Sequence, residues 1–145
     1  MLIASEGVAP PPVKTRANYA STKWCVDSGA NRDICRESVL FNGHEVAKTL
    51  VIGEAGTGHS FTSQAEGPIK LHVRGKALPL FQRTILAKQV QENIMSVTEA
   101  VDRGYVMVFN RRGVQMMDPK DVQLNVKPIL CGSRDSKSRL FYQFP

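Results

Sequence analysis

The sequence predicts a mostly β domain with one short α-helix, and three patterns carry this prediction. Apolar and polar residues alternate over 69–73 and over part of 78–86, which is typical of half-buried strands. A glycine-rich turn at 53–58 separates two further segments, 46–52 and 59–63, that we expect to be strands of a hairpin. Ser-Val-Thr-Glu at 96–99 has the form of a capping box, which indicates the start of a helix.

Composition sets the limits for the domain. The chain has 145 residues, of which 42% are hydrophobic, so a single domain with a real core is expected. No run approaches the ~18 apolar residues of a membrane span, and no basic segment followed by an apolar one opens the chain. Three cysteines are too few and odd in number for a disulfide framework, and they fit a reducing compartment. We therefore expect a cytoplasmic protein with no membrane partner.

Metal and nucleic-acid sites are weakly supported. Cys25 and Cys35 lie ten positions apart, Cys25 is expected to be a small buried hydrophobe, and the three histidines show no paired spacing, so no metal or other cofactor is expected. The net charge of +6 favours anionic partners. The basic residues are scattered without interleaved aromatic residues, so nucleic-acid binding is expected to be incidental. A basic nucleic-acid-binding domain is the alternative, and it would show steep salt dependence.

The chemistry-bearing stretch is Asp27-Ser28-Gly29, which follows the apolar, β-prone residues 24–26. Two carboxylates about 3 Å apart share one proton, and such a pair can activate a water and polarise a peptide carbonyl together. That is the chemistry of aspartic peptidases. An Asp-Ser-Gly triplet taken alone is more often a plain turn.

Such a site needs a second aspartate, and this chain supplies one copy of the triplet. The nearest other candidates, at 102–104 and 135–137, lack the hydroxyl or the glycine. A two-fold axis would set Asp27 against its twin in a second chain. Ser28 would then hydrogen-bond at the dimer centre, and Gly29 would let a substrate strand approach the main chain.

The remaining elements follow in order. Pro10-Pro11-Pro12 indicates a stiff arm over 1–22, either a cleavable linker or a terminus with no role. Residues 31–42 are polar and irregular, with four candidate core residues: Ile34, Val39, Leu40 and Phe41. The helix that starts near 96 should end at Gly104, and a hairpin with strands at 105–109 and 114–117 should follow.

A rival interpretation concerns the glycine-rich turn. Residues 53–60 spell G-x-x-x-x-G-H-S, which is one residue away from a phosphate-binding P-loop. The lysine that would reach the phosphates is missing, and Gly67-Pro68 stands where a helix should follow. A hairpin tip is therefore expected instead of a nucleotide site.

Two segments in the right order resemble one known family. Residues 24–30 resemble the active-site segment of retropepsins, most closely those of copia-type retrotransposons, in which Trp-x-x-Asp-Ser-Gly-Ala opens the protease. Residues 93–96, running on through 101–105, resemble the family's apolar loop, short helix and following strand. The similarity covers roughly 23–117.

The resemblance implies a fold and a biological setting. The fold would be a closed β-barrel or sandwich with a flap hairpin and one short helix, active as a two-fold homodimer. The arm 1–22 would precede a protease domain at 23–117, and 118–145 would be a connector toward an integrase, although the tail could instead pack on the protease as an extra strand. The enzyme would be an aspartic endopeptidase that processes its own retrotransposon polyprotein, in the cytoplasm or within virus-like particles.

The resemblance also implies site residues. The catalytic residues would be Asp27, Ser28 and Gly29. The substrate would be held by Gly29, Ala30 and Asn31 below and by Ile52, Gly53, Glu54, Ala55 and Gly56 of the flap above. Retropepsins commonly have an acidic residue at the position of Asn31 and an arginine in the helix, where this chain has Val97. The missing ion pair leaves open an alternative function, a catalytically silent binding or assembly module with the same fold.

Overall fold

The computed structural model describes residues 23–143 except 55, 74, 75, 79, 80, 124–126, 129 and 130. The predicted arm 1–22 therefore lies outside the described residues. Strands dominate the described chain: β1 (Trp24–Asp27), β2 (Ile34–Cys35), β3 (Val46–Ala47), β4 (Val51–Gly53), β5 (Ser60–Thr62), β6 (Ala65–Gly67), β7 (Leu71–Val73), β8 (Lys76–Leu78), β9 (Thr84–Leu86), β10 (Asn93–Ser96), β11 (Val106–Asn110), β12 (Gly113–Met117), β13 (Gly132–Arg134) and β14 (Phe141–Gln143). One α-helix, α2 (Val97–Asp102), and two 3-10 helices, Ser38–Phe41 and Pro119–Asp121, complete it. None of the described helices has the length and apolar character to cross a membrane.

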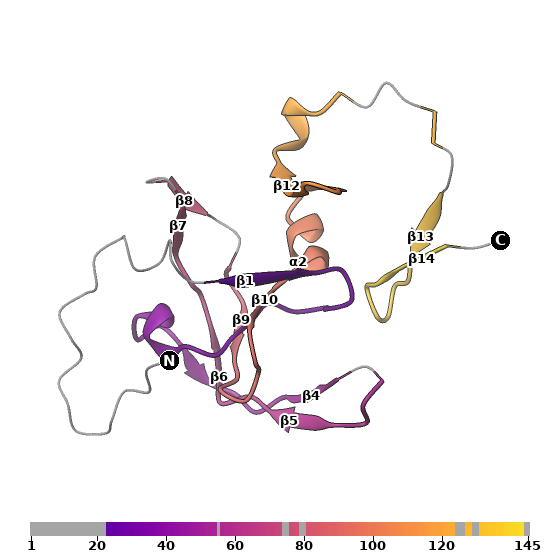
Figure 1. Cartoon of the computed structure of the whole chain (residues 1–145). Helices are drawn as coiled ribbons and strands as arrows, with labels where there is room; N and C mark the ends of the chain where they lie inside the picture. The colour runs from indigo at the N-terminus through magenta and orange to yellow at the C-terminus, as the bar shows by residue number, and fades with distance from the viewer. Residues whose placement is uncertain are drawn as a thin grey trace.

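Six strands form one mixed sheet in the order β1-β10-β2-β9-β6-β3 (Figure 1). β1 runs parallel to β10, and β2 runs parallel to β9, whereas the other pairs in this sheet are antiparallel. Because β1 is an edge strand, its carboxyl end is open on one side. The register places Asp27, the last residue of β1, level with Ser96 at the end of β10.

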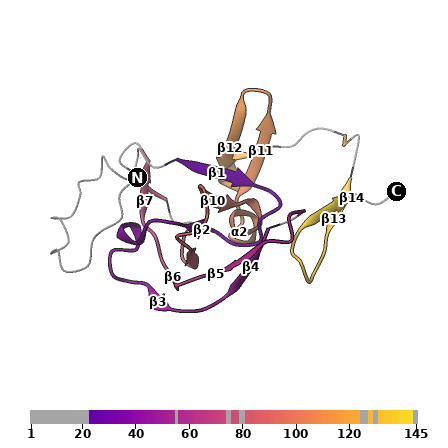
Figure 2. The same cartoon turned by 60° about the horizontal axis from the view of Figure 1, so that its bottom comes forward.

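The mostly β architecture with one short α-helix is confirmed, but the strands do not close into a barrel within the described part of the chain. Eight strands form two-stranded sheets of their own: β4-β5, β7-β8, β11-β12 and β13-β14. The figures show these pairs projecting from the central sheet (Figures 1 and 2). Strands of two to five residues are too short to wrap continuously around a core.

The prediction of one strand over 46–52 is wrong. β3 pairs with β6 in the main sheet, while β4 pairs with β5 outside it. Ser63 causes the break, because its Oγ donates to the Lys48 carbonyl at 2.6 Å and accepts from the Leu50 N–H at 2.8 Å. A side chain thus takes the place of two ladder hydrogen bonds, and the chain changes direction there.

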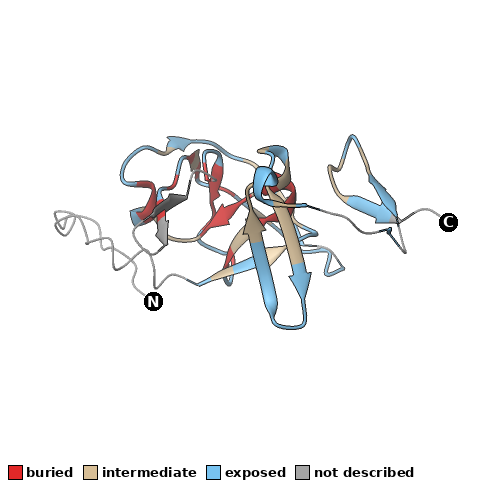
Figure 3. Cartoon of the chain, turned by 90° about the horizontal axis from the view of Figure 1, so that it is seen from above, coloured by how far each residue is buried: buried red, intermediate tan, exposed pale blue. Residues whose placement is uncertain are grey.

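The core consists of two clusters on opposite faces of the sheet. Successive residues of a strand point to opposite faces, so Cys35 and Leu86 join one cluster while Ile34 and Ile85 join the other. Phe41 and Phe81 are the largest fully buried side chains of the first cluster. Buried residues gather at β6, β9, β10 and α2, whereas the strands of β4-β5 are mainly exposed and those of β11-β12 change from half-buried to exposed toward the hairpin tip (Figure 3).

The region 31–42 shows both successes and errors of prediction. Ile34, Leu40 and Phe41 are buried as expected, whereas Val39 is 53% exposed. β2 was not predicted, because two residues are too few for an alternating pattern. Cys25 is exposed and not buried, since it lies on the edge strand.

Candidate active site

The Asp27 turn closes the end of β1 and is built by a local hydrogen bond. The Gly29 N–H donates to Asp27 Oδ1 at 2.7 Å, which holds the carboxylate over its own turn. A Cβ at Gly29 would meet that oxygen at 3.2 Å, so a larger residue would displace the carboxylate. Asp27 is half-buried, whereas Ser28 and Gly29 are exposed. Ser28 makes no hydrogen bond to any residue that the structure describes, so its hydroxyl is available to a partner or ligand.

Ser96 fastens this turn to the sheet and to α2. Its Oγ donates to the Ala30 carbonyl at 2.6 Å and accepts from the Glu99 N–H at 3.1 Å, which caps the helix. Gly104 follows the helix with a φ of +88°, as predicted for its end. The predicted capping box is only half formed, because the Ser96 N–H donates to Asp33 Oδ1 at 2.8 Å and not to Glu99.

We expect Ser96→Ala to lower the free energy of unfolding by about 1–2 kcal/mol, because the helix loses its cap and the half-buried Ala30 carbonyl loses its donor. Denaturant unfolding measures this change. Ser133→Ala is the matched control, since Ser133 is exposed on β13 and should leave stability within about 0.5 kcal/mol. Equal stabilities of the two variants would contradict the role given to Ser96.

Asp33 is the residue of this site that the sequence did not reveal. Its side chain is buried, and the residue is 2% exposed. Burial raises the pKa of Asp33 from 3.8 to about 7, against the opposing effect of the hydrogen bond from the Ser96 backbone. Glu99 adds to the rise, while Arg103 and Arg32 oppose it. An aspartate directly before two apolar residues is a weak signal, and nothing in that pattern distinguishes it from a turn.

Glu99 is the centre of an ion-pair cluster on α2. Its side chain is 8% exposed and contacts three guanidinium groups, at 3.5 Å (Arg32 Nε), 3.6 Å (Arg103 Nη2) and 3.0 Å (Arg139 Nη2). Arg32 also binds Glu66 at 2.6 Å. Asp102 is a second carboxylate of α2 that two arginines contact: it lies 3.4 Å from Arg139 and also pairs with Arg134. The cluster ties the loop after the Asp27 turn to α2, β6 and the C-terminal residues.

The glycine-rich hairpin is confirmed as β4 and β5, which rules out the helix that a P-loop requires. The Glu54 N–H donates to the His59 carbonyl at 2.9 Å, and Gly56 has a φ of +82°, so the tip is a tight turn. Gly53, Glu54 and Gly56 are exposed, and Ala55 lies outside the described residues. Ile52 instead packs on the core cluster around Ile34, which makes it an anchor of the hairpin.

The predicted site residues fall into two groups in space. Gly29, Ala30 and Asn31 share the Asp27 turn and its following loop, and the residues of the hairpin lie on the same side of the molecule as the end of β1 in both views (Figures 1 and 2). Among the described residues, no second carboxylate bonds to Asp27; Asp33 is turned into the interior instead. Within the described residues, the Asp27 turn thus presents one carboxylate, that of Asp27 itself.

Among the described residues, no group of three or more potential metal ligands occurs. Comparison with models of known protein families and with curated proteins finds no match to this chain. The candidate site thus consists of the Asp27 turn, the buried residues Ser96 and Asp33 that hold it, and the β4-β5 hairpin.

Proposed function

We propose that this chain is a retropepsin-like aspartic endopeptidase of the copia type, which acts as a homodimer and processes a retrotransposon polyprotein. One observation carries the proposal. An Asp-Ser-Gly turn lies at the open end of the edge strand β1, its carboxylate oriented by Gly29 and its backbone fixed by Ser96. A fixed, accessible carboxylate beside an exposed hydroxyl is what a two-fold dyad needs from each chain.

In this proposal, the two Asp27 carboxyl groups share one proton across the dimer axis. The ionised group takes a proton from a water between them, and the protonated group hydrogen-bonds the scissile carbonyl. The water oxygen adds to the carbonyl carbon and gives a tetrahedral intermediate. Its collapse breaks the C–N bond as the amine leaves with a proton, so no covalent enzyme adduct forms.

The substrate would lie extended between the Asp27 turn and the β4-β5 hairpin. An extended peptide can add main-chain hydrogen bonds to exposed backbone groups, as a strand does. Gly29 and Asn31 are exposed below, and Gly53, Glu54 and Gly56 are exposed above. The Gly29 N–H, the Glu54 N–H and the Asn31 carbonyl already have partners within the chain, so the substrate would use the other backbone groups of these residues. Hairpin closure would exclude water from the reaction.

Two measurements on the full chain test this function. Size as a function of concentration should show a dimer at micromolar concentration. Mass spectrometry should show cleavage of peptides that cover 1–22 and 118–145 at mildly acidic pH. A protein that stays monomeric at high concentration and cleaves neither peptide would instead fit a silent module of the same fold.

A further inference from the structure

The C-terminal residues 131–143 form a compact unit, which we call the C-terminal hairpin. β13 and β14 pair through three register positions and do not pair with any other described strand. The turn between them is organised by Asp135 Oδ2, which accepts from the Lys137 N–H at 3.0 Å and the Ser138 N–H at 2.6 Å. Arg139 follows in the left-handed region at φ +64°. A non-glycine residue held there indicates that surrounding contacts fix it.

Arg139 connects this hairpin to the candidate site. Its Nη2 donates to the Asn31 carbonyl at 2.9 Å and to Glu99 Oε1 at 3.0 Å, so one guanidinium nitrogen spans the active-site loop and α2. The Arg139 carbonyl in turn accepts from Thr98 Oγ1 at 3.3 Å. Asn31 lies four positions after Asp27, and 108 positions separate it from Arg139.

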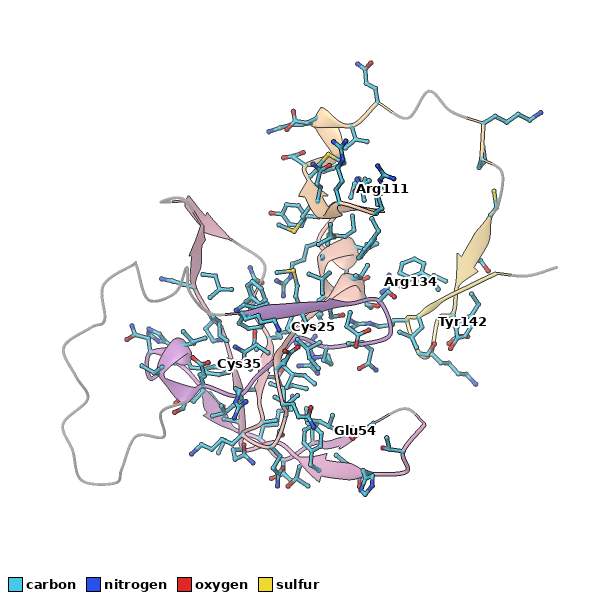
Figure 4. The ribbon with its side chains drawn as sticks, in the orientation of Figure 1. Cys25, Cys35, Glu54, Arg111, Arg134 and Tyr142 are labelled. Atoms are coloured by element: carbon cyan, nitrogen blue, oxygen red, sulfur yellow. The ribbon has the colours of Figure 1, made fainter. Side chains whose placement is uncertain are left out.

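A second arginine of the hairpin supports the first. Arg134 Nε donates to the Arg139 carbonyl at 2.9 Å, and its Nη1 pairs with Asp102 on α2. Arg134 lies where the C-terminal hairpin meets α2 (Figure 4). The hydrogen bond from Arg134 lowers the pKa of Asp102, so this carboxylate stays ionised at mildly acidic pH.

Two cations meet at Glu99 across this contact: Arg32 of the loop lies 3.5 Å from its carboxylate, and Arg139 of the C-terminal hairpin lies 3.0 Å from it. Asn31 brings no charge to the loop, the negative charge is on α2 at Glu99, and the hairpin supplies a cation that reaches both. Glu99 is nearly buried and Arg139 is 30% exposed, so water screens their interaction only in part. Charge-assisted hydrogen bonds from a planar guanidinium fix geometry as well as adding energy.

We propose that Arg139 is a positioning residue of the peptidase site, which holds the Asn31 backbone in place for substrate from the C-terminal hairpin. This inference rests on the proposed function. It makes residues 131–143 a working part of the site, whereas the resemblance predicts a connector there. The tail packs on the domain through side chains and not as an added strand.

The test compares Arg139→Gln, Arg139→Lys and the control Arg111→Gln in the full chain. Arg111 is exposed at the tip of the β11-β12 hairpin, so its variant makes the same charge change away from the site. We expect Arg139→Gln to raise KM for a peptide about tenfold with a smaller change in kcat, because a charge-assisted hydrogen bond to the substrate-binding loop is lost. Arg139→Lys should recover part of this loss, since lysine restores the charge but not the planar set of N–H donors of the guanidinium group.

Hydrogen exchange separates a failure of this inference from a failure of the proposed function. Arg139→Gln should speed amide exchange at 28–32 relative to Arg111→Gln, even if the chain cleaves no peptide. Faster exchange without any cleavage by the native protein would sink the proposed function, but it would keep the contact by which Arg139 holds the loop at Asn31 in place. Unchanged exchange and unchanged KM in Arg139→Gln would overturn the inference. If Arg139→Gln does not fold, the same comparison with Arg139→Lys decides.

Discussion

Asp27→Asn is expected to abolish peptide cleavage, with kcat lowered by at least about a thousandfold, since general acid–base groups contribute about 10²–10⁴. An asparagine cannot share a proton with its twin, so neither the water nor the scissile carbonyl is activated. The amide oxygen can still accept from the Gly29 N–H, so the turn should keep its shape. Product analysis by mass spectrometry at several pH values measures the loss, and circular dichroism checks the fold.

Asp118→Asn is the matched control for this loss. Asp118 is also an aspartate that accepts from a backbone N–H two residues on, that of Lys120 at 3.1 Å, but it lies far along the chain at the start of a 3-10 helix. The same chemical change there should leave cleavage within about twofold of the native rate. Native-like cleavage by Asp27→Asn would show that another group does the chemistry.

Asp33→Asn should stabilise the protein near neutral pH and remove most of a pH dependence that the native chain shows. The pKa of Asp33 is about 7 in the folded protein, against its ordinary value of 3.8. The folded state therefore binds the Asp33 proton more tightly than the unfolded state does. The stability that this proton contributes is fully present below the unfolded pKa and is lost as pH rises through about 7. The full change in the free energy of unfolding is on the order of 4 kcal/mol, because each pKa unit is worth about 1.4 kcal/mol.

Denaturant unfolding at a series of pH values tests this expectation. The asparagine can still accept from the Ser96 N–H, so the site keeps its acceptor without a buried charge. Asp118→Asn again serves as control: the Lys120 N–H lowers the pKa of Asp118, so it contributes in the opposite direction and should leave the fall in stability between pH 4 and 7 in place. If the free energy of unfolding of the native protein did not change between pH 4 and 7, the raised pKa of the buried Asp33 would be contradicted.

Local signals were enough to predict several elements. The helix followed from a capping serine at 96 and a glycine at 104, and the β11-β12 hairpin followed from two largely apolar runs around a short polar turn. The end of β1 at Asp27 followed from an apolar run before small residues. Each of these patterns lies within about ten residues, so no distant contact was needed to recognise it.

Distant contacts made by single side chains could not be predicted in this way. Ser63 divides a strand by bonding Lys48 and Leu50, and Asp33 replaces Glu99 in the capping box. Arg139 reaches a loop that lies 108 positions earlier. Hydropathy patterns report which face of an element is buried, but they carry no information about which polar side chain meets which backbone group.

The most direct test of the central claim is a mixing experiment with native and Asp27→Asn chains, at a concentration where size measurements show a dimer. If each site needs one aspartate from each chain, a mixed dimer is inactive. An excess of about ninefold of the variant should then lower cleavage by the native chain about tenfold, because few native chains find a native partner. The same ninefold excess of Asp118→Asn controls for crowding and competition. Because that variant is expected to be active, total cleavage should then rise about tenfold instead of falling. Full native activity in the presence of excess Asp27→Asn would show that a single chain cleaves by itself, and it would contradict the two-chain site.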